Sequence, residues 1–403
     1  MNVRRISLAA VMIGVSVAGC GDDGERADTS TSAPQTATMT ASVGSTSAGS
    51  SGETGAPTTT AGETGVVSTG DTSTSEATTG STSGTGSTGS TGQVSSTGLD
   101  TTTGGPCMDI LPVPAGPEAV MADEYKPFYQ AYDLGAVPKQ GGGVLPRLGG
   151  LVVAPDDPLL AYVVGPSEVP EAQLHSIALE RGPCGHIIGF KGEAQLVLMA
   201  PYLDLMVNGP KGIVFVSHYP TADLSQYIAG QAALASTIDL GALGMEAIHS
   251  PGGINFVPPG YPEAGQLRIA GFNINHNGTS GWYRATIDYQ DPTYAITKLS
   301  KTVDIPNGPG GFAYIPVGSP LFPEQRIIMT EWNSVPQAVS SFAVDAAGDP
   351  IPDTRKGFFT SFAKPWGSYF EPETGDYIFL QWEQQPDHVY IVQGFVPPPP
   401  LPG

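Results

Sequence analysis

The sequence predicts an all-β protein, a five-bladed β-propeller, that follows a disordered N-terminal tether. The first reason is a short apolar strand ending in proline, which recurs five times at a spacing of roughly 50 residues. The second is that further short apolar runs follow each copy, and the third is that helical periodicity is nearly absent. This pattern is typical of propellers, because one small sheet cannot bury its own faces and must stack on neighbouring sheets around an axis.

Each repeat opens with the expected inner strand of a blade, most clearly in GGINFVPPGYPEAGQLRIAGF at residues 252–272. Glycine at its start suits a crowded channel wall, and proline ends it where no ladder donor is needed. The copies start 55, 48, 58 and 56 residues apart and occupy residues 150–155, 205–210, 253–258, 311–316 and 367–372. Second strands are expected at residues 159–164, 212–216, 266–270, 326–329 and 377–380. Third strands are expected at residues 173–179, 282–288, 338–344 and 388–392.

The propeller is expected to span residues 107–395, before a proline-rich tail at residues 396–403. Its last repeat shows three strands, so we expect residues 128–134 (FYQAYDL) to supply the missing outer strand and close the ring. A sixth, degenerate blade within residues 107–150 is left open. Helix is expected at most as a short turn within residues 222–237.

The N-terminus predicts export and lipid anchoring. Residues 1–20 contain two arginines and a short apolar run, and Val17-Ala18-Gly19-Cys20 resembles the lipobox of bacterial lipoproteins, which implies lipidation of Cys20. Gly21 follows in place of aspartate, which favours the outer membrane or cell surface of a Gram-negative bacterium. The alternative is an ordinary secretory peptide. Residues 21–106, rich in Ser, Thr and Gly, have too few large apolar groups to fold and form the tether.

The net charge and the cysteines limit the kinds of ligand and metal site that we expect. From Cys107 onward the chain holds 29 acidic and 14 basic residues, a net charge of −15, which disfavours nucleic-acid binding. Acidity is equally typical of soluble exported proteins. Cys107 and Cys184 form a disulfide or remain as two thiols, and no Cys/His spacing of a zinc site is present.

Strings such as GGINFVPPGYPEAGQL, GFAYIPVGSPLF and ETGDYIFLQW resemble an uncharacterised group of exported bacterial propeller proteins. They are more distantly similar to NHL/SMP-30-type and Kelch-like propellers, over about residues 119–395. In that group an acidic residue often precedes the inner-strand glycine. Here Asp204 alone fits, beside Gly149, Gly252, Gly310 and Trp366, which puts an SMP-30-like metal site in doubt.

Loops before inner strands and loops between second and third strands share one face of a propeller, where ligands usually bind. The repeat register assigns to this rim Asp204, His218, Tyr219, His249, Phe272, Asn273, Asn307, Glu331, Trp332, Asn333, Trp366, Trp382 and Glu383. Aromatic rings beside carboxylates can stack on a sugar or hold a cation. The alternative for the tryptophans is packing between blades. Asp204, His218 and His249 are a candidate metal or acid/base cluster, with surface or packing histidines as the alternative.

These observations favour a binding module for a glycan, peptide or protein partner over an enzyme. No catalytic fingerprint is present, and catalytic residues and metal ligands are not assigned. One alternative is a propeller hydrolase or lactonase, for which Ca²⁺ is the candidate ion; otherwise no cofactor is expected. The other is a structural component of the cell envelope. Convergence of channel carboxylates would favour the hydrolase, and a plugged channel would favour the structural component.

Overall fold

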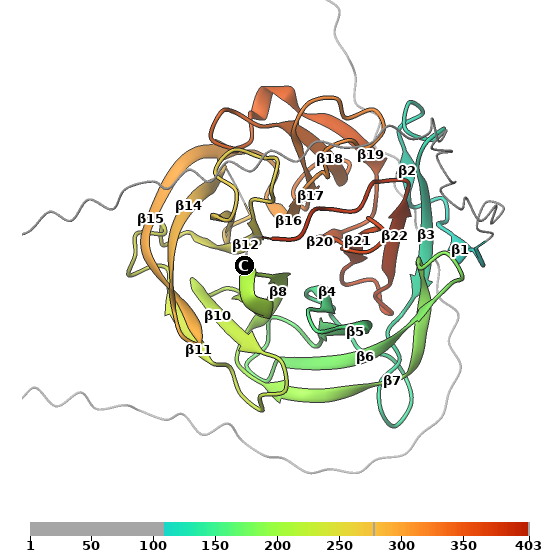
Figure 1. Ribbon diagram of the computed structural model, residues 1–403, viewed down its shortest axis with the longest axis horizontal. Helices are drawn as coiled ribbons and strands as arrows, with labels where there is room; N and C mark the ends of the chain where they lie inside the picture. Colours follow the sequence, from blue (N-terminus) through green and yellow to red (C-terminus); the bar gives the residue numbers. More distant parts are fainter. Residues whose placement is uncertain (1–108, 277–278, 402–403) are drawn as a thin grey trace, which may run out of the picture. The chain divides into compact units, whose positions relative to one another are not determined.

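The computed structural model describes residues 109–276 and 279–401, which form five antiparallel sheets around one axis (Figure 1). The predicted five-bladed propeller is therefore confirmed. The lipobox, the tether and Cys107 lie outside the described residues. The sixth blade left open is not formed by the described part of residues 107–150, because its strands β1 to β3 join blades 4 and 5.

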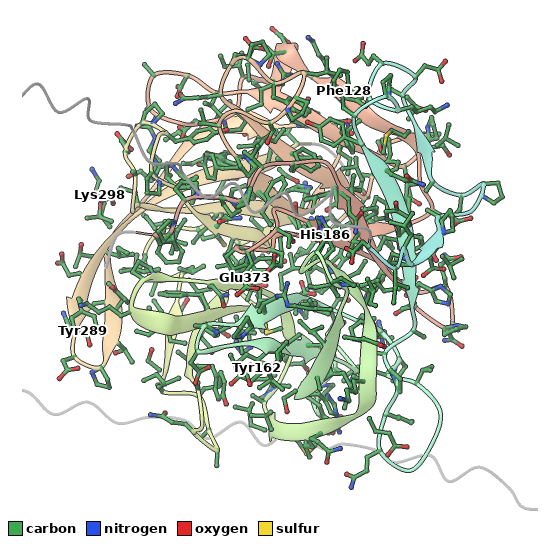
Figure 2. The ribbon with its side chains drawn as sticks, turned by 45° about the vertical axis from the view of Figure 1, so that its right-hand side comes forward. Phe128, Tyr162, His186, Tyr289, Lys298 and Glu373 are labelled. Atoms are coloured by element: carbon green, nitrogen blue, oxygen red, sulfur yellow. The ribbon has the colours of Figure 1, made fainter. Side chains whose placement is uncertain are left out.

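The first three blades have four strands each, given from the axis outward. Blade 1 contains β4 (Leu151–Ala154), β5 (Asp157–Val164), β6 (Gln173–Arg181) and β7 (Ile187–Met199). Blade 2 contains β8 (Leu203–Asn208), β9 (Ile213–His218), β10 (Asp223–Ile228) and β11 (Ser236–Asp239). Blade 3 contains β12 (His249–Phe256), β13 (Leu267–Asn273), β14 (Ser280–Gln290) and β15 (Thr293–Ile305). Tyr289 lies near the tip of the β14–β15 hairpin (Figure 2).

The last two blades have five strands, because the N-terminal segment adds to both. Blade 4 contains β16 (Pro309–Tyr314), β17 (Arg326–Glu331), β18 (Ala338–Ala343), β19 (Lys356–Ser361) and β2 (Val120–Met121). Blade 5 contains β20 (Pro365–Phe370), β21 (Tyr377–Gln381), β22 (Val389–Gln393), β3 (Gln130–Gly135) and β1 (Val113–Pro114). The described helices are the 3₁₀ turns η1 (Pro210–Gly212) and η2 (Pro352–Thr354). In residues 109–276 and 279–401 no helix is long and apolar enough to cross a membrane.

The predicted repeat register is confirmed strand by strand, with one error. Pro155, Pro210, Pro258, Pro316 and Pro372 each follow the end of an inner strand by one or two residues. The helical turn expected at residues 222–237 is wrong, because this segment contains β10 and the start of β11. β10 pairs with a strand on each side and is buried along most of its length, so its sequence does not alternate.

Inner strands meet so closely at the axis that the channel is closed midway. A Cβ atom on Gly150 would lie 2.5 Å from Met206 N of the next blade, and one on Gly311 would lie 2.7 Å from Gly367 C. Only glycine fits such an approach. Residues in or next to the five inner strands leave a void of about 10 Å³ there. The channel therefore has two separate mouths, which we call upper (loops before inner strands) and lower (loops after them).

Closure of the ring occurs where β3 pairs with β22, as predicted. The buried ring of Tyr132 on β3 belongs to the core cluster shared by blades 1, 2 and 5. Ion pairs reinforce the contact between blades 1 and 5: Arg181 Nη2 lies 2.8 Å from Glu371 Oε1, and His186 Nδ1 lies 2.7 Å from Asp376 Oδ1. Glu373 Oε2 also lies 3.6 Å from Arg181 Nη1. His186 and Glu373 are labelled in Figure 2.

Deleting residues 107–136 is expected to abolish the cooperative thermal transition of the propeller. The deletion exposes the ladder edge of β22 and part of the core to water. Circular dichroism melts measure this, and deletion of the tether, residues 21–106, is the control that should leave the midpoint unchanged. A cooperative melt at the original midpoint after the 107–136 deletion would contradict the closure described here.

Candidate functional site

The residues predicted for the rim do lie at the upper ends of strands. Asp204 lies at the start of β8, His249 begins β12, and His218 and Glu331 end β9 and β17. Tyr219, Trp332, Trp382 and Glu383 lie in the loops that follow second strands, and Trp366 lies near the start of β20. Sharing a face does not bring them to one point. Across the described residues no three His, Cys, Asp or Glu side chains are grouped so as to hold a metal ion.

The two histidines are bonded within their own blades. His218 Nδ1 donates to Pro201 O at 2.7 Å, and its Nε2 lies 2.7 Å from Ser225 Oγ. His249 Nδ1 lies 2.7 Å from the Tyr283 hydroxyl. Burial lowers the pKa of both imidazoles, so they are neutral at pH 7. The cluster of Asp204, His218 and His249 considered from the sequence is therefore not assembled.

Glu331 is the centre of a buried hydrogen-bond network in blade 4. Its carboxylate accepts from Arg355 Nη2 at 2.5 Å, Ser340 Oγ at 2.6 Å and Asn307 Nδ2 at 2.9 Å. The side chain is fully buried, and these partners come from blade 4 and the loops that join it to its neighbours. This geometry stabilises the fold and leaves the carboxylate poorly placed to receive a ligand.

Aromatic side chains gather over the upper mouth. The ring centroids of Trp332, Trp366 and Trp382 lie 5.2 to 5.8 Å apart, and Phe272 packs edge-on against Trp366 at 5.9 Å. Tyr219 packs in turn against Phe272. Trp366 and Trp382 are buried, as expected for packing between blades, whereas Trp332 and Tyr219 are half-buried and face the rim. The cluster therefore contains two partly exposed rings, Trp332 and Tyr219.

Two carboxyl groups lie beneath this cluster. Asp204 is 0% exposed, and its Oδ1 accepts from Trp366 Nε1 at 2.9 Å. Its Oδ2 is buried and accepts no well-formed hydrogen bond within the described chain. The Leu205 amide lies near enough to lower the Asp204 pKa, but it donates to Ser217 Oγ. Glu168 is held beside it, because the Glu168 amide donates to Leu203 O at 3.0 Å. The Glu168 side chain is 8% exposed, so it reaches the surface where Asp204 does not.

The electrostatics of the pair favour bound protons. Burial raises the pKa of Asp204, and the hydrogen bond from Trp366 opposes this only in part. Burial, and then the charge of Asp204, raise the pKa of Glu168 well above its usual range, against the opposing charge of Arg147. Burial and the charges of both carboxyls raise the pKa of Tyr219 to about 12, which places Tyr219 in the same site. Two buried acids close together cannot both ionise cheaply, so the pair holds a proton.

A cation, a tryptophan and a glutamate form a joint between blades 4 and 5. Lys364 Nζ lies 2.7 Å from Glu383 Oε2 and 5.5 Å from the centroid of Trp332. Lys364 precedes the inner strand of blade 5 with a left-handed φ of 51°, and Glu383 has a φ of 57°. The predicted rim residue Glu383 is therefore an ion-pair partner at the surface, with its side chain 42% exposed.

The same joint recurs between blades 5 and 1. Arg147, also at φ 51°, lies 5.3 Å from the centroid of Trp382, and its Nη2 lies 4.0 Å from Glu168 Oε2. Glu168, at φ 60°, occupies the position that Glu383 has in blade 5. It differs because Asp204 of blade 2 lies beside it. The glutamate is therefore buried beside a second acid in this joint, whereas it is exposed in the joint between blades 4 and 5.

Glu168 and Arg147 are absent from the set predicted from the sequence. The signal was available: Arg147 stands three residues before the inner-strand Gly150, as Lys364 stands before Gly367. Glu168 lies between a second and a third strand, in a loop that the register already placed on the upper face. What the sequence does not show is that Glu168 is buried and lies close to Asp204.

Carboxylates on the lower face accept hydrogen bonds from backbone amides in turns. Glu371 Oε2 accepts the amides of Glu373 and Thr374 at 3.0 and 2.6 Å, and Asp157 Oδ1 accepts from Leu159 N at 2.9 Å. Cys184 is disulfide-bonded, and its amide donates to Asp109 Oδ1 at 3.1 Å. Cys107 lies outside the described residues, so the Cys107–Cys184 bond stays a prediction.

The fold and this site define a five-bladed β-propeller with a closed channel and an acid-aromatic upper mouth. No protein-family model matches the chain, and no curated protein matches it. Solved structures similar to it include a putative oxidoreductase (glucose dehydrogenase) from Thermus thermophilus, at 15% identity and a TM-score of 0.37, covering 71% of this chain and 98% of that one.

Two further structures show the same level of similarity. A putative 6-phosphogluconolactonase from Bacteroides uniformis is 14% identical, with a TM-score of 0.34 and coverage of 63% and 74% of the two chains. An auxiliary nutrient binding protein from Bacteroides ovatus is 11% identical, with a TM-score of 0.37 and coverage of 72% and 76%. Similarity this distant carries no argument about activity, so the function is argued from the site.

Glu331→Gln is expected to lower the free energy of unfolding by more than about 1 kcal/mol, because it weakens buried hydrogen bonds to a charged partner. Urea denaturation measures the change. The matched control is Glu383→Gln, an exposed ion-pair residue that should stay within about 0.5 kcal/mol of wild type. If Glu331→Gln matched its control, the structural role assigned to Glu331 would be wrong.

Proposed function

We propose that the protein is a recognition module that binds a hydroxyl-rich ligand, a glycan, at the upper mouth of its propeller. The observation that carries this proposal is the buried Asp204 Oδ2, which accepts no well-formed hydrogen bond within the described chain and lies beneath the aromatic cluster. An unsatisfied buried acceptor costs about 1–3 kcal/mol. A ligand hydroxyl would hydrogen-bond Glu168, the member of the pair that reaches the surface, and so extend the hydrogen bonding toward Asp204.

The rim supplies the other half of sugar recognition. The half-buried rings of Trp332 and Tyr219 offer faces on which the C–H groups of a pyranose can stack. Lys364, 32% exposed at its side chain, and His276, exposed beside the Tyr219 hydroxyl at 3.4 Å, add polar contacts at the edge. These contacts come from a few groups, most of which lie at or next to the ends of strands. A few groups held in fixed positions favour selective binding.

A hydrolase is the second candidate. Its support is that Glu168 and Asp204 both have raised pKa values, and a protonated carboxyl at a site mouth can act as a general acid. A structural envelope component is the third, supported by the channel that is closed midway. Against it, a cavity of about 360 Å³ opens at the lower mouth, and that alternative predicts no pocket.

A glycan array probed with the purified full chain is expected to show selective binding. Glu168→Ala should weaken the strongest interaction at least about tenfold by calorimetry, because it removes the carboxyl nearest the surface. Glu373→Ala, the same change on a half-exposed residue of the lower face, is the matched control and should leave affinity within about twofold.

Absence of any glycan binding, or equal losses in the two variants, would overturn this function. Mass spectrometry of the bound glycan separates the first two candidates. Cleavage products that disappear with Glu168→Ala would replace the recognition module by the hydrolase.

We further propose that the module is exported and held at the outer membrane or cell surface by a lipid on Cys20, with residues 21–106 as its tether. The lipobox-like Val17 to Cys20 motivates this. Cys20→Ser should abolish lipid labelling and release the protein from the membrane fraction, because the acyl chains supply the membrane affinity. Membrane retention of Cys20→Ser, against a control of Ser7→Ala, would contradict the anchor.

A further inference from the structure

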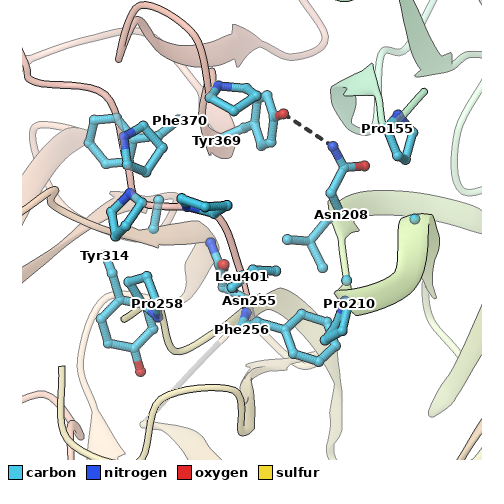
Figure 3. Close-up of a pocket in the computed structure, with 18 of the residues that line it drawn as sticks. Pro155, Asn208, Pro210, Asn255, Phe256, Pro258, Tyr314, Tyr369, Phe370 and Leu401 are labelled. Atoms are coloured by element: carbon cyan, nitrogen blue, oxygen red, sulfur yellow. Dashed lines mark hydrogen bonds between the residues drawn. The ribbon is translucent and has the colours of Figure 1, made fainter. Parts of the chain in front are cut away.

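The lower mouth of the channel carries a largely apolar pocket. Its volume is about 360 Å³, and four of the five repeat prolines lie in its walls: Pro155, Pro210, Pro258 and Pro372. Tyr314, Tyr369 and Phe256 add aromatic surface (Figure 3). The channel closes just above it, so this pocket is separate from the upper mouth.

The C-terminal segment of the chain lies across this pocket. It leaves blade 5 after β22 and runs to the centre of the ring, as the red trace in Figure 1 shows. Phe395 is buried in the core of blades 4 and 5, and the chain then passes over Gly375, where a Cβ atom would lie 2.5 Å from Val396 C. Pro398 to Leu401 form one wall of the pocket.

The contacts of this segment are apolar and few. Leu401 packs against the core shared by blades 2 and 3, and Figure 3 shows its side chain between Asn255 and Pro210. Val396 N donates to Ser319 Oγ at 3.3 Å, which is the one hydrogen bond found between residues 396–401 and the rest of the described chain. Contacts of this kind hold a segment in place without fixing it permanently.

The pocket and the segment match a known mode of peptide binding. A run of prolines has fixed φ angles and no amide hydrogens, so it adopts an extended polyproline II helix at low entropic cost. Such helices dock into grooves lined by aromatic and apolar side chains. The walls also hold an unused polar group: Asn208 Nδ2 donates to Val153 O at 2.8 Å and Tyr369 Oη at 3.2 Å, while its buried Oδ1 has no partner in the described chain.

We propose that the lower mouth is a binding site for a proline-rich, extended peptide segment of a partner protein, and that the chain's own residues 396–401 occupy it in cis. A proline-rich segment of a partner offers the same apolar surface as the tail and displaces it by competing for these walls. This site is independent of the glycan site proposed above.

The test uses a fluorescent peptide with the sequence of residues 396–401, VPPPPL, and measures its binding by anisotropy. A chain that ends at Val396 is expected to bind the peptide saturably and at least about tenfold more tightly than the full chain does, since the competing tail is gone. Tyr369→Ala in the shortened chain should lose most of this affinity. Peptide VAAAAL is the control and should not bind.

Saturable binding that is stronger in the shortened chain and specific for the proline peptide supports the proposal. No saturable binding to the shortened chain, or equal binding of VAAAAL, overturns it. If the shortened chain melts at a lower temperature than the full chain, the full chain with Leu401→Asp is used in place of the shortened chain. Added VPPPPL peptide should then raise the melting midpoint of the Leu401→Asp variant. If the full chain is a dimer and the shortened chain is a monomer, the tail binds the lower mouth of a second copy. That result would overturn the proposal that the tail occupies the mouth of its own chain.

Discussion

The close approach of the five inner strands at the axis is the constraint on which the rest of the molecule depends. Gly150 and Gly311 leave no room for a Cβ atom, and the void between them is about 10 Å³. A propeller with a wider ring can hold a ligand within its channel, whereas this one cannot. Within the channel, binding is therefore confined to the two mouths, and the two mouths are lined by different kinds of residue.

The upper mouth contains two similar joints that differ through a single neighbour. The two joints have the same construction. In each, a basic residue with a left-handed backbone conformation, Lys364 or Arg147, contacts a glutamate and a tryptophan ring. In blade 5 the glutamate stays at the surface. In blade 1 the glutamate, Glu168, is buried, and its burial and the charge of the adjoining Asp204 raise its pKa. The same arrangement of residues therefore has an acid with an altered pKa in blade 1 and an exposed ion pair in blade 5.

The repeat explains how much of the fold could be predicted. Prolines at the ends of inner strands and short apolar runs between them are local features, so strand order, register and the closure by residues 128–134 followed from the sequence. The segment at residues 222–237 was misjudged because β10 is buried on both faces and shows no alternation. The fifth strands of blades 4 and 5, β2 and β1, contain two residues each, and β2 pairs with β19 across a long sequence separation, which local patterns do not report.

The candidate site was predicted only in part, for a related reason. The register placed the correct loops on one face, and it found Asp204 and the tryptophans. It could not distinguish Glu331, whose carboxylate is bonded by Arg355, Ser340 and Asn307, from Asp204, whose Oδ2 has no such partner in the described chain. That difference depends on side-chain partners from several strands, and no spacing in the sequence encodes it.

The central claim is that the buried carboxyl pair at the upper mouth holds a proton at neutral pH. Infrared difference spectroscopy between the wild-type protein and the double variant Glu168→Gln, Asp204→Asn tests it directly. The wild type should show the carbonyl band of a protonated carboxyl, and this band should be missing from the double variant. A wild-type spectrum with the bands of ionised carboxylates only, at neutral pH, would show that the pair holds no proton.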